Sequence, residues 1–280
     1  MGELVPACAG HAPGTQRAAT ATAVGGLSRF AAARGIPAGL KFLLDYDVIE
    51  AFCVAGLNGR ASSTRGSYRS ALYRLARPVH GEPGQRATPF AGAKAPAPYS
   101  PAERAGLAAT AAAQRDAAKR ASALAVVVFG IGAGLRPGEL EALRGSDVTR
   151  HGRRVSVHVS GPAARVVPVT AGYAGRAAGL AAGTGNTHLF RPGPADRSYK
   201  NVVTNFARTL AGDPAAPRLT LSRCRSSFIC GHLAAGTPVA ELLAISGIRQ
   251  AESLARYACH VDGAPPKAVL RAWDRRQQAR

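Results

Sequence analysis

Acidic side chains are scarce in this 280-residue sequence: 16 Asp and Glu stand against 36 Lys and Arg, which gives a formal net charge of +20. A surplus of that size attracts any polyanion nearby, so it argues against a small metabolic enzyme. Hydrophobic residues make up 46% of the chain, which excludes a disordered basic tail. The charge balance therefore indicates a folded protein whose partner is nucleic acid.

Cysteines and long apolar runs are also limited. The five cysteines are an odd number with no CxxC pair, which fits neither a disulfide framework nor a zinc site and favours a reducing cytosol. The longest apolar run, residues 123–135, is shorter than the about 20 residues that span a bilayer. The opening segment MGELVPACAG carries an acid where a signal peptide has basic residues. We expect a cytoplasmic, nucleoid-associated protein without membrane contact or a bound metal.

Composition divides the first part of the chain into segments. Residues 1–20 are rich in Ala, Gly and Thr without periodicity, and they predict a loose tail. Residues 21–80 carry apolar side chains at helical spacings, including a helix over 64–77 that interleaves arginines with apolar positions. Those arginines are either a solvated face or, as we expect for Arg65, Arg69 and Arg74, DNA contacts. Residues 81–99 are crowded with Pro, Gly and Ala and indicate a linker.

Residues 100–280 predict a larger domain. Helices are expected over 102–114 and 117–129, followed by a short helix in PGELEALR. Two strands, 155–159 and 165–169, flank an SGP turn, and mostly helices complete the chain. The expected fold class is therefore mostly α with a small antiparallel β-sheet, in two domains.

Two segments of this larger domain place arginines at helices. In GLRPGELEALRGSDV, residues 134–148, Pro137 fits the first turn of a helix, so Arg136 lies just ahead of that helix on a rigid support. The second segment, residues 219–261, reads LTLSRCRSSFICGHLAAGTPVAELLAISGIRQAESLARYACHV.

In this order the two segments resemble the two signature boxes of the tyrosine recombinases, the phage-integrase family. The first is similar to G-L-R-x-x-E-L-x-x-L-x-x-x-D, and the second to H-x-x-R followed by an apolar helix, a turn glycine and a tyrosine. The matching residues are Gly134, Leu135, Arg136, Glu139, Leu140, Leu143 and Asp147, then Arg225, Phe228, Gly247 and Tyr257. The segment SGPAARVVPV resembles the family's β-hairpin, and residues 21–80 resemble its core-binding domain.

The resemblance implies a catalytic domain preceded by a helical domain that clasps DNA, and it implies catalytic roles for Arg136, Arg225 and Tyr257. Tyr257 would attack a phosphodiester to give a covalent 3′-phosphotyrosine, while the two guanidiniums bind the non-bridging oxygens. This chemistry needs no cofactor, in agreement with the absence of a P-loop, a GxGxxG turn and a carboxylate cluster.

The resemblance also implies partners. Such recombinases act on double-stranded DNA as homo-oligomers, as tetramers when active, and a C-terminal segment docks onto a neighbouring copy. Residues 267–280 are either such a segment or a frayed basic end.

Three positions depart from the family's pattern. The hairpin lysine is replaced by Ser160, the histidine of H-x-x-R by Ser222, and the His or Trp after the turn glycine by Ile248. A positioned general acid contributes about 10²–10⁴-fold, and a serine cannot act as an acid near pH 7. Arg165, Arg223 or His260 could lean into the site in compensation, and we expect both of these arginines to contact DNA.

The sequence thus leaves alternatives for the function. The chain is a site-specific recombinase or integrase that cleaves DNA through Tyr257, or a catalytically degenerate form that acts as a DNA-binding or architectural factor. A third interpretation takes TPVAELLAISGIRQAESLARYA as a helix-turn-helix, with Gly247 in the turn and residues 250–257 as the helix that reads the groove. Tyr257 could also be only a core residue of an amphipathic helix. A cavity that gathers Arg136, Arg225 and Tyr257 would favour the first two functions.

Overall fold

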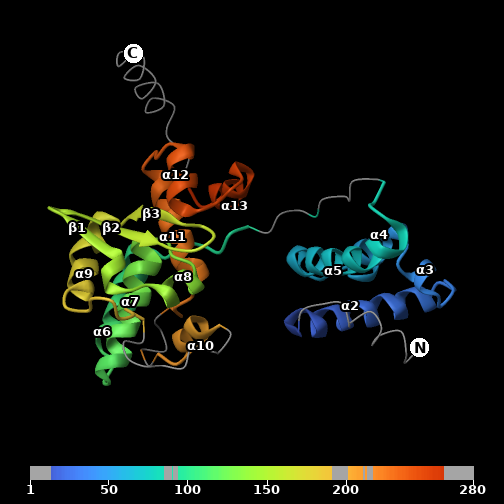
Figure 1. The fold of residues 1–280 in the computed structure, drawn as a ribbon, viewed down its shortest axis with the longest axis horizontal. Coiled ribbons are helices and arrows are strands. Elements are labelled where there is room, and N and C mark those ends of the chain that lie inside the picture. Colours follow the sequence, from blue (N-terminus) through green and yellow to red (C-terminus); the bar gives the residue numbers. More distant parts are fainter. Residues whose placement is uncertain are drawn as a thin grey trace, which may run out of the picture. The chain divides into compact units, whose positions relative to one another are not determined.

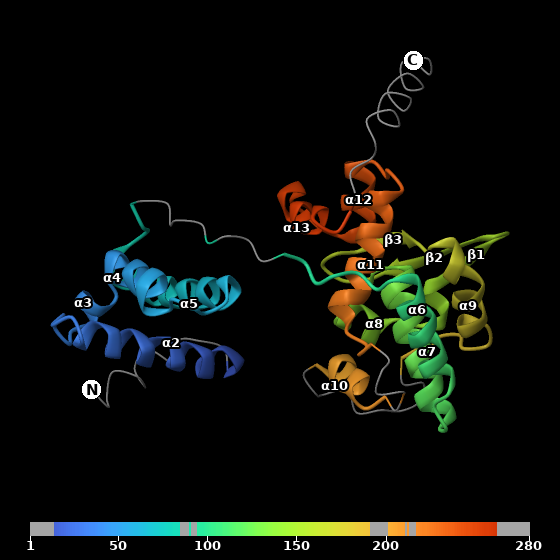
Figure 2. The same cartoon turned by 180° about the vertical axis from the view of Figure 1, so that it is seen from behind.

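The computed structural model describes residues 14–84, 90, 94–190, 201–210, 212 and 217–261. The chain divides into two compact units, residues 1–93 and 94–280, each with its own cluster of buried apolar side chains. Figures 1 and 2 show the helices and strands of both units from opposite sides. No helix in the described part is long and apolar enough to cross a membrane.

The first unit is a small helical bundle. Its elements are α2 (Gly14–Ala32), α3 (Leu40–Leu43), α4 (Tyr46–Ala51), the π-helix η1 (Phe52–Gly56) and α5 (Ser62–His80). Helices α2 and α5 lie side by side in both views. Leu27, Ile49 and Leu72 are almost fully buried where α2, α4 and α5 meet, because apolar residues recur on one face of each helix.

The loose tail predicted over residues 1–20 is wrong from Gly14 onward, where α2 begins; residues 1–13 lie outside the described residues. Alanine has the highest helix propensity of all residues, and this segment is rich in it. Thr20 and Ala23 are buried despite their small side chains. Small residues such as Ala, Gly and Thr differ little in hydrophobicity, so the sequence shows only a weak helical periodicity. For this reason the start of α2 was not predicted.

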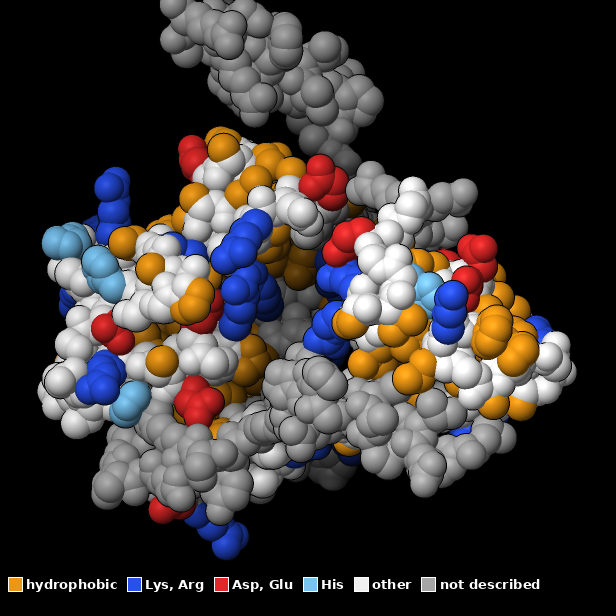
Figure 3. Space-filling model, turned by 45° about the vertical axis from the view of Figure 1, so that its right-hand side comes forward, with side chains coloured by type: hydrophobic (Ala, Val, Ile, Leu, Met, Phe, Trp, Pro, Cys, Tyr) orange, Lys and Arg blue, Asp and Glu red, His pale blue; other side chains and the backbone are white. Residues whose placement is uncertain are grey.

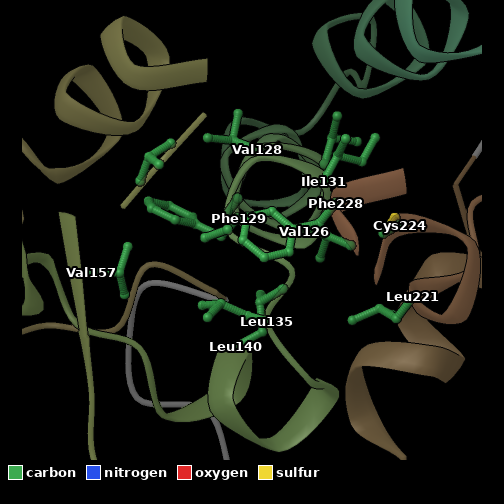
Figure 4. Close-up of a cluster of buried hydrophobic side chains, with 14 of the residues drawn as sticks. Val126, Val128, Phe129, Ile131, Leu135, Leu140, Val157, Leu221, Cys224 and Phe228 are labelled. Atoms are coloured by element: carbon green, nitrogen blue, oxygen red, sulfur yellow. The ribbon is translucent and has the colours of Figure 1, made fainter. Parts of the chain in front are cut away.

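Helix α7 (Ala117–Gly132) runs through the core of the second unit. It packs against α6 (Pro101–Ala112), α9 (Ala171–Ala181) and α11 (Leu221–Ala234). Almost every residue between Ser122 and Gly132 is buried, as expected of a helix that is apolar on all sides. Figure 4 shows Val126, Val128 and Phe129 leaving α7 in different directions toward these neighbours.

A three-stranded antiparallel sheet, in the order β1 (Val148–His151), β2 (Arg154–Val159) and β3 (Arg165–Pro168), lies at one side of this core. The two strands expected at 155–159 and 165–169 are confirmed as β2 and β3. Strand β1 was not expected, because its sequence VTRH is short and its last two residues are exposed. In β2, Val155, Val157 and Val159 face the core, so Ser156 and His158 lie on the opposite face.

The remaining elements of the second unit are α8 (Pro137–Ala142), the 3₁₀-helix η2 (Gly145–Asp147), α10 (Val202–Arg208), α12 (Val239–Ser246), the 3₁₀-helix η3 (Ala251–Leu254) and α13 (Ala255–Ala258). Cys224 and Cys230 of α11 are buried core residues. Together these elements confirm the expected fold class, a mostly helical chain with a small antiparallel sheet.

Candidate functional site

Arg136 lies in the sharp connection between α7 and α8. Gly134, two residues earlier, has φ +61°, and a Cβ there would lie 2.5 Å from the Phe228 ring, so only glycine allows this turn. The backbone N–H of Arg136 donates to Glu139 Oε2 at 2.9 Å, which caps α8. Its guanidinium Nη2 donates to the Gly247 carbonyl at 2.7 Å, and its side chain remains 41% exposed.

Arg225, on α11, is bound by two backbone carbonyls. Its Nη1 donates to Gly134 and its Nη2 to Ser246, both at 2.7 Å. Burial lowers the pKa of this guanidinium, and the nearby charge of Arg136 lowers it further, whereas Tyr257 and Glu139 raise it. The carbonyl of Ser246 that binds Arg225 is next to the carbonyl of Gly247 that binds Arg136, so one turn of chain positions both guanidiniums.

Arg165, on β3, is bound by a carboxylate as well as by a carbonyl. Its Nη1 and Nη2 donate to the two carboxylate oxygens of Glu139 at 2.7 and 3.0 Å, and its Nε donates to the Ile245 carbonyl at 2.8 Å. Only 7% of the Arg165 side chain is exposed. Its guanidinium is therefore engaged within the chain, and a DNA contact by Arg165 stays a prediction.

The three arginines share one anchor, the carboxyl end of α12. The consecutive carbonyls of Ile245, Ser246 and Gly247 each accept from a different arginine, namely Arg165 on β3, Arg225 on α11 and Arg136 just before α8. The last carbonyls of a helix have no partner within the helix and carry the negative end of its dipole. These carbonyls orient the guanidiniums without neutralising them, which leaves the charges of Arg136 and Arg225 for an anionic ligand.

Tyr257 lies in α13, beside this anchor. It lines an open hollow of about 470 Å³ together with Arg136, Pro162, Ala163, Gly247, Ile248, Arg249, Gln250, Ser253 and Arg256. The tyrosine is 8% exposed and belongs to the apolar core, as one interpretation of the sequence predicted. Its hydroxyl has no hydrogen-bond partner among the described residues, although it is not sealed from solvent. One residue thus belongs both to the core and to a hollow that Arg136 also lines.

A second hollow, of about 390 Å³, adjoins the first at Arg136. Its walls come from α8, the end of β2 and the turn after it, and include Glu139, Asp147, His158, Ser160, Pro162 and Ala163. Arg136, Pro162 and Ala163 line both hollows. His158 was not among the residues singled out in the sequence. The alternation in RVSVHVS was the signal available, because it places His158 and Ser160 on the same face of β2.

The three substituted positions are not gathered in one place. Ser160 lines the second hollow and Ile248 lines the hollow of Tyr257. Ser222 is exposed in the first turn of α11 and lines neither hollow. The apolar side chain of Ile248 can exclude water there but cannot bind a phosphate oxygen.

Arg223 and His260 do not lean into the site, which corrects that expectation. Arg223 forms an ion pair with Glu103 at 2.8 Å and lies over the Tyr99 ring at 4.0 Å. His260 Nε2 is 2.6 Å from the Ala95 carbonyl. Both side chains bind the segment that precedes α6, and a DNA contact by Arg223 stays a prediction.

In the first unit, two of the arginines expected to contact DNA are engaged within the chain. Arg65 donates to the Cys53 carbonyl at 2.8 Å, and Arg69 pairs with Glu50 at 3.2 Å. Their guanidiniums lie 4.4 and 4.1 Å from the centre of the Phe90 ring. Arg74 is exposed on α5. Figure 3 shows Lys and Arg side chains standing in groups on the face in view. DNA contact by these three arginines stays a prediction.

The helix-turn-helix interpretation is wrong. It needs a continuous recognition helix over residues 250–257. The structure instead has the 3₁₀-helix η3 and then the single turn α13. The turn glycine, Gly247, is occupied in binding Arg136.

No protein-family model matches the sequence, and no curated protein matches it significantly. Solved structures do share its fold. An integrase of the Tn1549 transposon, in complex with transposon right-end DNA, is 14% identical, with 95% of each chain covered and a TM-score of 0.55. The XerH site-specific recombinase bound to its difH substrate before cleavage is 15% identical, with 88% of this chain and 74% of that chain covered and a TM-score of 0.54. The chain therefore has the fold of these recombinases and integrases.

Proposed function

We propose that this chain binds double-stranded DNA and breaks and rejoins its strands, with Tyr257 as the nucleophile and a 3′-phosphotyrosine as the intermediate. The observation that carries the proposal is the shared hollow of Arg136 and Tyr257, with Arg225 bound to the Ser246 carbonyl, next to the Gly247 carbonyl that binds Arg136. The solved structures that share the fold are a site-specific recombinase and a transposon integrase, both bound to DNA. A likeness of fold and a matching set of side chains thus support the same chemistry.

Each of the three side chains has a distinct task in the proposed reaction. The oxygen of Tyr257 attacks the phosphorus, and the resulting covalent bond preserves the energy of the phosphodiester for rejoining. Arg136 and Arg225 bind the non-bridging oxygens, where negative charge increases in the transition state. Because backbone carbonyls already fix both guanidiniums, little reorganisation is needed when the phosphate arrives.

DNA binding itself is supported by the charge of the whole chain. A net charge of +20 favours a polyanion, and phosphate contacts make such binding weaken steeply as salt rises. The proposed partners are duplex DNA and further copies of this chain, with a tetramer for an active recombinase. The C-terminal segment proposed to dock onto a neighbour, residues 267–280, lies outside the described residues.

A specific observation favours a second candidate function. The residue next to Gly247 in the hollow of Tyr257 is Ile248, whose side chain cannot donate to a phosphate oxygen, and Ser222 lines neither hollow. A chain with fewer phosphate donors could retain DNA binding and lose cleavage. In that case it would serve as a DNA-binding or architectural factor built on the same fold.

Relaxation of supercoiled plasmid, stopped with SDS to trap protein–DNA adducts, tests the proposal without knowledge of a target sequence. The wild-type chain should relax the plasmid and leave a covalent adduct, and Tyr257→Phe should do neither. Tyr173→Phe is the matched control, because Tyr173 lies on α9 and lines neither hollow. It should behave as wild type.

The two candidate functions give different results in this assay. Salt-sensitive plasmid binding without an adduct, from wild type and Tyr257→Phe alike, would overturn the cleavage proposal and support the architectural one. An adduct that persists in Tyr257→Phe would assign the nucleophile to another residue.

A further inference from the structure

The two hollows adjoin at one phosphate-binding candidate, Arg136. Arg136, Pro162 and Ala163 are common to both, while Tyr257 lines only the first and His158 only the second. In phosphoryl transfer the attacking and leaving oxygens are roughly in line, on opposite sides of the phosphorus. When Tyr257 attacks a phosphate bound at Arg136, the leaving oxygen points away from Tyr257, and the adjoining hollow that His158 lines can receive it.

The leaving 5′-oxygen needs a proton, and the second hollow offers few donors. Its described titratable residues are Arg136, Glu139, Asp147 and His158. A guanidinium does not release its protons in proteins. Bonds from Arg165 and from the Arg136 N–H hold the pKa of Glu139 below its usual value although burial opposes them, so Glu139 is a carboxylate without a proton at neutral pH.

Asp147 is engaged as a hydrogen-bond acceptor rather than as a proton donor. Its carboxylate Oδ2 accepts the backbone N–H of Arg144 at 2.8 Å, at the start of η2. The hydroxyl of Ser160 is too weak an acid for this task near neutral pH. Histidine is the residue type whose charge changes between about pH 5 and 8, which suits proton transfer in both directions.

The position of His158 fits the task. It is exposed on β2, two residues before Ser160 and on the same face of the strand. Its ring makes no hydrogen bond to any of the described residues, so both ring nitrogens can face a ligand. Across the sheet it is paired with Val166, whose exposed apolar side chain does not compete for its protons.

We infer that His158 is the general acid for the 5′-oxygen leaving group, in place of a lysine that this hairpin does not contain; this role rests on the proposed strand cleavage. The Tyr257 oxygen bonds to phosphorus as the phosphorus–O5′ bond breaks, and the phenolic proton passes to solvent. The imidazolium of His158 gives its proton to O5′, which leaves as a 5′-hydroxyl. In rejoining, the 5′-hydroxyl attacks the phosphorus and gives its proton to neutral His158. The phosphotyrosine bond breaks as the phosphorus–O5′ bond forms, and the tyrosine oxygen takes a proton from solvent.

Replacement of the leaving oxygen by sulfur tests this role. The attachment position is first read from the trapped plasmid adduct of the wild-type chain. A duplex around that position is then made with either oxygen or sulfur as the 5′-bridging atom. A thiolate leaves without a proton, because the pKa of a thiol is only about 8.5. His158→Ala should cleave the oxygen duplex about 10²–10⁴-fold more slowly than wild type and the sulfur duplex at the wild-type rate.

The controls separate this role from the proposed function. His151→Ala, at an exposed histidine on β1 that lines neither hollow, should cleave both duplexes as wild type does. An oxygen-duplex rate for His158→Ala equal to wild type, or a slow rate that sulfur does not restore, overturns the role of His158 alone. Failure of the wild-type chain to form any adduct on plasmid overturns the proposed cleavage, and the role of His158 with it.

Discussion

Arg165 and Arg136 bind carbonyls of the same helix end and contact the same glutamate, yet the two arginines differ in the charge that they leave for a ligand. Arg165 is 7% exposed and donates to both oxygens of Glu139, so its charge is neutralised where it lies. Arg136 is 41% exposed, and its guanidinium is 3.9 Å from the same carboxylate. A carbonyl orients a guanidinium, whereas a carboxylate both orients and neutralises it. The first arrangement suits a ligand site and the second suits a scaffold.

The largest expected effect comes from breaking the scaffold side. Arg165→Met leaves Glu139 buried without its partner, and the loss of one member of a buried ion pair costs about 3–5 kcal/mol of unfolding free energy. Arg136→Met removes an exposed side chain and should cost less than about 1 kcal/mol, while cleavage falls about 10²–10³-fold. Urea unfolding and the adduct assay measure the two effects separately.

A second substitution sharpens this contrast. Changing Glu139 to Leu in the Arg165→Met background replaces the pair by apolar groups, which is often close to neutral, so most of the lost stability should return. Equal destabilisation by Arg165→Met and Arg136→Met would show that both arginines belong to the scaffold.

A smaller effect is expected at the glycine that ends α12. Gly247 has φ +65°, where alanine costs about 1–2 kcal/mol, and a Cβ there would lie 3.1 Å from the Arg165 guanidinium. Gly236→Ala is the matched control, because Gly236 has φ +72° and open space around its Cα. Both variants should lose similar stability in urea unfolding, but only Gly247→Ala should slow adduct formation, since it displaces a carbonyl that holds Arg136. An adduct rate unchanged in Gly247→Ala would contradict the anchoring role of this helix end.

The first signature segment could be predicted almost completely from the sequence. Gly134 is required by a positive φ, Pro137 begins α8, and Glu139 caps it, so residue types and spacing carry the geometry. The same holds for β2 and β3, whose alternation and turn are local properties. These features lie within a few residues of one another, which is why a pattern reveals them.

The anchor of the arginines could not be predicted in this way. Every residue has the same backbone carbonyl. The residue types at Ile245, Ser246 and Gly247 therefore do not show that three arginines bind there. The ion pair of Arg165 with Glu139 joins residues 26 positions apart, so the sequence pattern did not reveal it. The sequence thus singled out Arg136, Arg165 and Arg225 as candidates, and the fold shows that Arg136 keeps an exposed charge while Arg165 does not.

The smallest expected effect is on the pH dependence of stability. Burial is the largest single influence on the Glu139 carboxyl and raises its pKa, but the hydrogen bonds from Arg165 and the Arg136 N–H, together with the charges of both arginines, lower it below its usual value. A lowered folded-state pKa stabilises the protein above the ordinary pKa of glutamate, about 4.3, and that stability is lost as the pH falls through the folded-state value. The unfolding free energy of wild type should therefore exceed that of Glu139→Gln at neutral pH, and the difference should shrink below about pH 4. Glu141→Gln, on the same helix, is the control and should show a difference that depends less on pH. A difference in unfolding free energy between wild type and Glu139→Gln that stays constant down to acid pH would mean that Glu139 acts through its shape and hydrogen bonds rather than its charge. The contrast between the neutralised Arg165 and the exposed Arg136 would then rest on burial alone.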